Sequence, residues 1–115
     1  MPNPSNTPQG NIDGNWLLGV TLSPISVAPN TVAEQTFTVA GLKVGDFVDV
    51  SKPTVQGGLA LGNARVSATN TLAIAFVNAT AATITPTASE VYSVGVTRTN
   101  NLNATSTAAL LTQIT

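Results

Sequence analysis

Short runs in which apolar and polar side chains alternate recur along the chain, and they restrict its fold more than any other feature. In residues 16–22, for example, Leu18, Val20 and Leu22 share one side of the run. Successive side chains of a β-strand point to opposite faces, so this period of two predicts strands with one buried face. Glycine, proline and asparagine separate the runs, as turns do in antiparallel folds. The sequence therefore predicts an all-β protein, an antiparallel β-sandwich or jelly-roll-like barrel of about 7–8 strands.

The expected strands leave an arm at each end of the chain. Residues 1–15 are rich in proline, asparagine and glycine and predict an extended N-terminal arm without a helix or a central strand. Residues 16–99 are expected to form the β-sandwich domain, because the chain's 18 threonines and 13 valines fit a pleated sheet. Residues 100–115 form a C-terminal arm, in which residues 105–114 predict either a helix or an added strand. Strands are expected at 16–22, 34–40, 46–50, 64–69, 71–77, 82–86 and 90–98.

The chain has few charges, which excludes several classes of partner. Only 8% of its residues are charged, against roughly 25% in an average soluble domain, and its net charge is -1. Four lysines and arginines cannot neutralise a series of phosphates, so no nucleic-acid partner is expected. No run approaches the roughly 18 apolar residues of a membrane span, and the first ten residues lack the basic and apolar regions of a signal peptide. Such a weakly charged surface suits a protein that packs against others.

The residue types that most catalytic and metal sites need are missing. Without histidine or cysteine, the chain holds no Ser-His-Asp or Cys-His site, no disulfide and no histidine-ligated zinc. Asp46 and Asp49 would point to opposite faces of a strand, and a calcium ion bound by them is the alternative to two solvated carboxylates. A carboxylate pair formed elsewhere would lack the groove and aromatic contacts of a glycoside hydrolase. We therefore expect no enzyme and no catalytic, cofactor-binding or metal-binding residue.

Two short motifs have ordinary explanations. The sequence GGLALG at 57–62 is glycine-rich but does not fit the GxGxxG pattern of a phosphate-binding loop, so a turn or a bulge is expected. The N-A-T patterns at 78–80 and 103–105 fit N-glycosylation acceptors, which arise by chance in a chain rich in asparagine and threonine. Neither motif predicts a site.

Two other features indicate contact with a partner. Trp16 lies where the arm meets the domain, and tryptophan is enriched at binding hot spots; the alternative is an anchor in the core. The strand expected at 71–77 is apolar on both sides, so its second side must be covered by its own sheet or by a neighbouring subunit. The predicted interface residues are Trp16, Leu17, Ala73, Ala75, Val77, Leu110 and Leu111.

Three stretches resemble a known group of proteins. They are GLKVGDFVDVSKP (41–53), GNARVSATNTLAIAFVNAT (62–80) and TPTASEVYSVGV (85–96), within a similarity that covers roughly residues 25–98. Here the chain resembles the small β-rich modules of tailed-bacteriophage virion proteins. The resemblance implies a capsid decoration (cement) protein or a head-fibre or tail-fibre domain, commonly a trimer. It implies no catalytic or cofactor residue.

Together, these observations predict a structural virion protein, made in the host cytoplasm, that binds the outer surface of an assembled phage capsid and stabilises it. We expect a homotrimer whose arms hold the major capsid protein, with no nucleic acid, membrane or cofactor as a partner. The alternative is a carbohydrate- or receptor-binding module on a fibre or tail, which would expose a cluster of aromatic residues. A bacterial immunoglobulin-like adhesion domain cut from a longer protein is a third interpretation, against which Met1 and a tail at each end predict a complete gene product.

Overall fold

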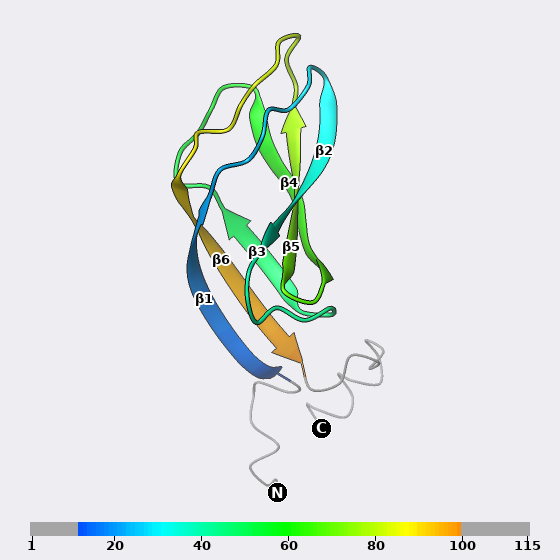
Figure 1. Ribbon diagram of the computed structural model, residues 1–115, viewed down its shortest axis with the longest axis vertical. Coiled ribbons are helices and arrows are strands. Elements are labelled where there is room, and N and C mark those ends of the chain that lie inside the picture. Colours follow the sequence, from blue (N-terminus) through cyan, green and yellow to red (C-terminus); the bar gives the residue numbers. More distant parts are fainter. Residues whose placement is uncertain (1–11, 100–115) are drawn as a thin grey trace, which may run out of the picture.

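Two three-stranded antiparallel sheets make up the part of the chain that the structure describes, residues 12–99 (Figure 1). In this computed structural model, one sheet has the strand order β1-β6-β3 and the other has the order β2-β5-β4. Residues 12–99 contain no helix, and so none that is long and apolar enough to cross a membrane. The strands are β1 (Ile12–Leu22), β2 (Thr31–Thr38), β3 (Phe47–Ser51), β4 (Leu59–Ala68), β5 (Thr71–Asn78) and β6 (Glu90–Thr99).

The alternating side chains of the sequence face inward and outward as expected. In β1, Leu18, Val20 and Leu22 are partly or fully buried, while Leu17 and Thr21 are exposed. Every pair of neighbouring strands is antiparallel, with β6 central in one sheet and β5 central in the other. The prediction of an all-β, antiparallel fold is therefore confirmed.

The described residues form six strands, so the prediction of about 7–8 strands is wrong. The segment expected at 82–86 forms only an isolated bridge, in which Val27 and Ile84 exchange backbone hydrogen bonds of 2.7 and 3.1 Å. Pro86 has no amide hydrogen to donate, so the ladder cannot continue through it. In contrast, β1 begins at Ile12, four residues before the expected boundary, although only as an edge strand.

The two ends of the described chain lie together, because Ile12 pairs with Thr99 across β1 and β6 (Figure 1). Residues 1–11 and 100–115 lie outside the described residues. The predicted division into an N-terminal arm, a domain and a C-terminal arm stays a prediction, except that residues 12–15 belong to β1.

Side chains from both sheets form one hydrophobic core. Its four largest fully buried members lie on the two central strands, with Leu72, Ile74 and Phe76 on β5 and Tyr92 on β6. Burial of one such side chain stabilises a fold by roughly 1.5–3 kcal/mol. The four edge strands supply the partly buried side chains that pack around this centre. The stability of the fold therefore depends mainly on β5 and β6.

Asn78, at the end of β5, is a buried polar residue whose side chain is fully hydrogen bonded. Its Nδ2 donates to Val27 O and Ala82 O at 3.0 and 2.7 Å. Its Oδ1 accepts from the backbone N and the hydroxyl of Thr80 at 2.9 and 2.8 Å. The side chain thus joins the β1–β2 connection to the segment after β5. The N-A-T pattern at 78–80 therefore has a structural role, because its threonine saturates the amide oxygen.

Turn residues that the sequence indicates adopt the backbone conformations that favour them. Asn70, between β4 and β5, has a φ of 60°, and Gly41, after β2, has a φ of 98°. Asn70 Oδ1 accepts a 2.8 Å hydrogen bond from Gly41 N, and Asn70 N donates to Leu42 O at 2.9 Å. These bonds hold the β2–β3 connection against the β4–β5 hairpin and so position Asp46, which follows in the chain.

Candidate functional site

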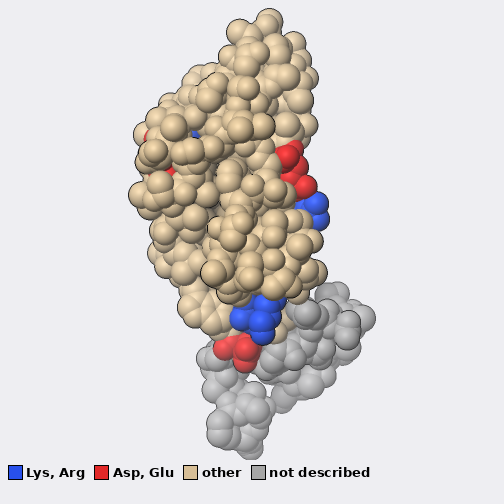
Figure 2. Space-filling view, viewed as in Figure 1, with Lys and Arg blue, Asp and Glu red and all other residues tan. Residues whose placement is uncertain are grey.

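Charged side chains occur in a few small groups on the visible face, with wide uncharged surface between them (Figure 2). No group of three or more acidic, histidine or cysteine side chains that could hold a metal ion occurs in residues 12–99. Most of the charges instead neutralise one another. The ion pairs are Lys52 with Glu90 at 2.9 Å, Arg65 with Glu34 at 2.8 Å, and Arg98 with Asp46 at 2.7 Å.

Asp46 has the least exposed of these carboxylates, with 2% of its side chain accessible. Arg98 Nε and Nη2 donate to its two oxygens at 2.8 and 2.7 Å, and Lys43 N donates to Oδ2 at 2.9 Å. The hydrogen bonds from Arg98 are the main reason that the pKa of Asp46 is lowered. The interpretation of Asp46 as a solvated carboxylate is therefore wrong. Asp49 lies apart from this pair, exposed on β3, so the structure does not bring the two aspartates together as a calcium site.

Acid should weaken the fold through these ion pairs. Hydrogen bonding lowers the pKa of Asp46, Glu34 and Glu90 in the folded state. Such a carboxyl stabilises the fold above its unfolded-state pKa, and the stabilisation is lost as the pH falls through the folded-state pKa. We therefore expect the free energy of unfolding to decrease below about pH 4.5. Asp46→Asn should be less stable than wild type at neutral pH, and urea unfolding should show this difference shrinking in acid; a difference that is constant with pH would contradict the expectation.

Trp16 lies against Gly14 and beneath Arg98 at the end of β1. Arg98 Cζ is 5.0 Å from the centre of the tryptophan ring, in cation–π geometry. The absence of a side chain at Gly14 makes room for the ring, because a Cβ there would lie 2.6 Å from Trp16 Cζ2. With 44% of its surface exposed, Trp16 lines a hollow of about 280 Å³ together with Leu18 and Leu42. It is not an anchor in the core, and its role in partner contact stays a prediction.

Gly14→Ala should displace the Trp16 ring. The added methyl group overlaps the ring, and overpacking of this kind costs roughly 1–3 kcal/mol. Trp16 is the chain's one tryptophan, so its fluorescence reports the change alone, and we expect emission at longer wavelength as the ring becomes hydrated. Gly57→Ala is the matched control, because a Cβ at that position meets nothing within 4 Å. Unchanged emission in Gly14→Ala would show that the ring does not rest on Gly14.

The outward side of β5 is covered within the chain. Glu34 on β2 lies opposite Ala75, and Arg65 on β4 lies opposite Ala73. Arg65 Nε and Nη2 both donate to the Glu34 carboxylate at 2.8 Å, so this ion pair crosses the outer face of β5. Ala73 is fully buried, and Ala75 and Val77 are half-buried. The cover thus comes from the strand's own sheet, and contact of these residues with another subunit stays a prediction.

The outer face of the β1-β6-β3 sheet, in contrast, exposes apolar side chains. Leu17 on β1, Phe47 on β3 and Val91 on β6 are 80%, 68% and 55% exposed. Leu17 and Asp49 both lie opposite Gly95 of β6, so small residues of the central strand separate the two edge strands on this face. Asp49 also lies on this face, opposite Gly95. The face therefore carries three exposed apolar side chains among glycine and small polar residues, such as Ser93 and Thr97.

Sequence reasoning identified Leu17 on this face but missed Phe47 and Val91. Alternation gave a signal for both residues. It places Phe47 on the opposite side from the buried Val48, and Val91 on the opposite side from the buried Tyr92. Exposure of Phe47 follows from that alternation only if β3 has one buried face. The other predicted interface residues near the C-terminus, Leu110 and Leu111, lie outside the described residues.

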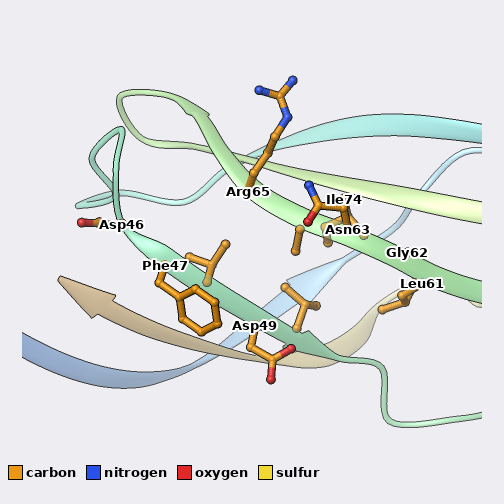
Figure 3. A pocket seen from close by; sticks show the side chains of 11 residues that line it. Asp46, Phe47, Asp49, Leu61, Gly62, Asn63, Arg65 and Ile74 are labelled. Atoms are coloured by element: carbon orange, nitrogen blue, oxygen red, sulfur yellow. The ribbon is translucent and has the colours of Figure 1, made fainter. Parts of the chain in front are cut away.

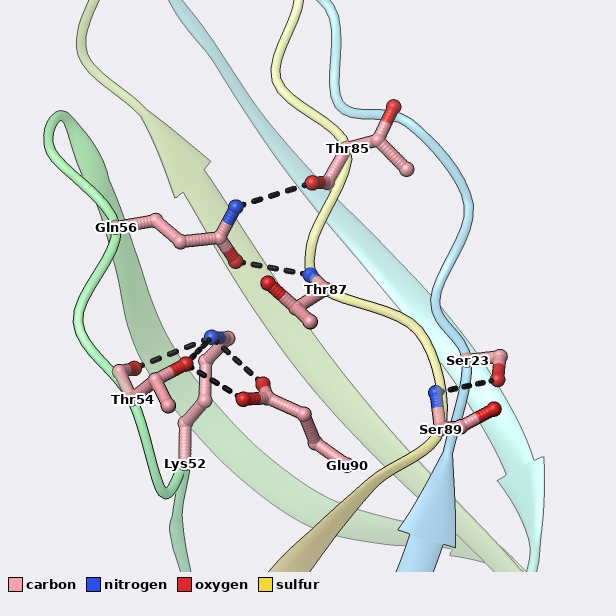
Figure 4. Close-up of polar contacts among 8 residues, drawn as sticks. All are labelled: Ser23, Lys52, Thr54, Gln56, Thr85, Thr87, Ser89 and Glu90. Carbon is pink, nitrogen blue, oxygen red and sulfur yellow. Dashed lines mark hydrogen bonds and ion pairs between the residues drawn. The ribbon is translucent and has the colours of Figure 1, made fainter.

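A second polar cluster joins the β3–β4 connection to the start of β6 (Figure 4). Thr54 Oγ1 donates to Glu90 Oε2 at 2.6 Å and accepts from Lys52 Nζ at 2.9 Å. Lys52 Nζ also forms an ion pair with Glu90 Oε1 at 2.9 Å. The amide of Gln56 bonds the backbone of residues 85–87 at 3.1 and 2.9 Å. Lys52 and Glu90 thus hold the β3–β4 connection against the start of β6, and each is already paired with the other.

Comparison with protein-family models, with curated proteins and with solved structures finds no significant match to the chain. The resemblance to phage virion modules therefore stays a prediction from the quoted stretches. The surfaces of the described residues therefore provide the evidence for function. Among them, the outer face of the β1-β6-β3 sheet stands out for its exposed apolar side chains.

Proposed function

We propose that the protein is a structural virion component that binds the outer surface of an assembled phage capsid and stabilises it. The proposal is carried by the outer face of the β1-β6-β3 sheet, where Leu17, Phe47 and Val91 are exposed. Apolar patches of this kind mark protein–protein interaction sites. Covering this face with a coat protein buries apolar area and removes few charges from water, as in the centre of protein interfaces.

We propose further that the two sheets form a β-sandwich and that the assembled protein is a homotrimer. Its partner is the major capsid protein, and its location is the capsid surface. Each contact can be weak, because contacts repeated over a lattice sum to strong attachment. A protein that binds only the assembled shell stabilises that shell by mass action.

Residues 1–11 are proposed to form the arm that contacts neighbouring coat subunits. Because β1 begins at Ile12, deletion of residues 2–11 leaves the strand whole. We expect the shortened protein to keep its circular dichroism spectrum and to coat empty shells at lower occupancy than the full chain does, as measured by electron microscopy. Equal occupancy would exclude the arm. Absence of the protein from purified particles of the phage that encodes it would exclude the function as a whole.

A further inference from the structure

A groove runs between β3 and β4, which are edge strands of different sheets (Figure 3). It consists of two adjoining hollows of about 450 and 260 Å³, which share Val50 and Leu61 as lining residues. Leu59 and Ala64 also line it, and all four side chains are only partly buried against the core. The groove therefore leaves apolar side chains open to contact with a further segment.

The β3 side of the groove offers a free strand edge. In the described chain β3 pairs with β6 alone, in unbroken register from Phe47 to Ser51, so the backbone groups of its other edge have no strand partner. The β4 side differs, because a register shift between Leu61 and Ala64 interrupts its pairing with β5. An added strand would therefore pair with β3 and pack its side chains against β4.

The opposite side of the molecule, between β1 and β2, is closed by the chain's own connection. Gln35 of β2 donates from Nε2 to Ile25 O and accepts at Oε1 from Ile25 N, each at 2.9 Å. These two bonds fasten the β1–β2 connection to β2 in the manner of a strand pair. No corresponding bond between β3 and β4 occurs in the described residues, which leaves the groove open.

We infer that the groove binds residues 105–114 of a second copy of this chain, as a strand antiparallel to β3, because antiparallel pairing is the more stable of the two per residue. The segment, TSTAALLTQI, has no proline and no charge, and on a strand Ala108, Leu110 and Ile114 share one face. That face can pack against Val50, Leu59 and Leu61. The larger hollow is also lined by charged side chains, of which Asp46 and Arg65 are already ion-paired within the chain. The N-terminal residues 1–11 do not suit the site, because their three prolines cannot donate to a ladder.

The direction of the chain favours a second copy over the same molecule. Phe47 lies opposite Thr97, so the chain leaves β6 at Thr99 beside the Phe47 end of the groove. A strand antiparallel to β3 has to enter at the Ser51 end. Residues 100–104 reach at most about 18 Å when extended, and β3 itself is roughly 17 Å long. In the same molecule, residues 100–104 would have to span the whole length of β3 before residue 105 could enter the groove. The segment from a second copy can enter directly at the Ser51 end.

This exchange makes every copy both a donor and a receiver. Contacts of this head-to-tail type close into a ring when the rotation between copies allows it. The inference concerns how copies join one another and does not depend on whether a capsid is their target. Failure of capsid binding and failure of strand exchange therefore give different results.

Single cysteines report the contact directly, because the chain has none of its own. Full-length Ser51→Cys and isotopically heavy Thr107→Cys are mixed and treated with a short bismaleimide, and mass spectrometry identifies mixed dimers. Ser26→Cys with Thr107→Cys is the matched control, since Ser26 is also exposed but lies in the β1–β2 connection. We expect mixed dimers with Ser51→Cys and few with Ser26→Cys. A Ser51→Cys/Thr107→Cys double variant that links only within one chain overturns the inference.

Sedimentation of the purified full-length protein measures the same contact without cross-linking. Leu110→Asp, on the face toward the groove, should weaken self-association about tenfold or more and yield monomers at micromolar concentration. Leu111→Asp, on the opposite face of the same strand, should leave the oligomer intact. A monomeric wild type, or an oligomer that survives Leu110→Asp unchanged, overturns the inference.

Discussion

Asn78→Ala is expected to lower the free energy of unfolding by about 3 kcal/mol. The substitution removes four hydrogen bonds, two donated to Val27 O and Ala82 O and two accepted from Thr80. It also leaves a hole in a buried site, because only 1% of Asn78 is exposed. The melting temperature should fall by roughly 15 °C. Urea unfolding followed by circular dichroism measures the loss.

Two further variants show whether the hydrogen bonds of Asn78 are responsible. Asn63→Ala, at an exposed position, should change stability by no more than about 0.5 kcal/mol. Asn78→Asp should be strongly destabilised at neutral pH, because a buried carboxylate would face Val27 O and Ala82 O. Burial raises the folded-state pKa of such a group, so its deficit relative to wild type should shrink as the pH falls. Equal stability of Asn78→Ala and wild type would show that the buried amide is dispensable.

Leu17→Asp/Phe47→Asp is expected to weaken attachment to capsid shells by roughly 100-fold, which corresponds to about 2.7 kcal/mol. The two side chains are 80% and 68% exposed in the free protein, so charging them leaves the core untouched. In the proposed complex each carboxylate would be buried without a partner, which is costly at the centre of an interface. Shell occupancy at increasing protein concentration gives the change in affinity.

The control for this double variant has the same chemistry at another place. Ile25→Asp/Val44→Asp introduces two carboxylates at exposed positions in connections between strands, where the original side chains are 72% and 59% exposed. It should bind shells as wild type does. An equal loss in both double variants would indicate repulsion by added charge, and no loss in Leu17→Asp/Phe47→Asp would exclude this face from the contact.

The fold class was predictable because its causes are local in the sequence. Alternation placed Leu18 and Leu22 on the inner side of β1, and Pro24 ended that run as expected. The strand count was not predictable in the same way. The segment around Ile84 has strand-like composition, yet its length and the proline that follows allow only a bridge to Val27. Local preference cannot tell a bridge from a short strand, because the difference depends on what lies opposite.

The ion pairs and the buried amide were missed for a different physical reason. Asp46 and Arg98 are 52 positions apart and meet only because the β2–β3 connection is held beside the end of β6. A single sequence has no local signal for such a contact. At Asn78 a signal existed, since an asparagine followed two positions later by threonine can satisfy itself. The same three residues also match a glycosylation acceptor, so the pattern by itself does not identify the structural role of Asn78.

The pairing of Ile12 with Thr99 determines how the molecule responds to force. Pulling the two chain ends in opposite directions acts on the last rung of the β1–β6 ladder, so its hydrogen bonds break one after another and each break requires little force. A force that draws Ile12 and Thr99 apart should therefore open the sheet from this end, one pair of residues at a time.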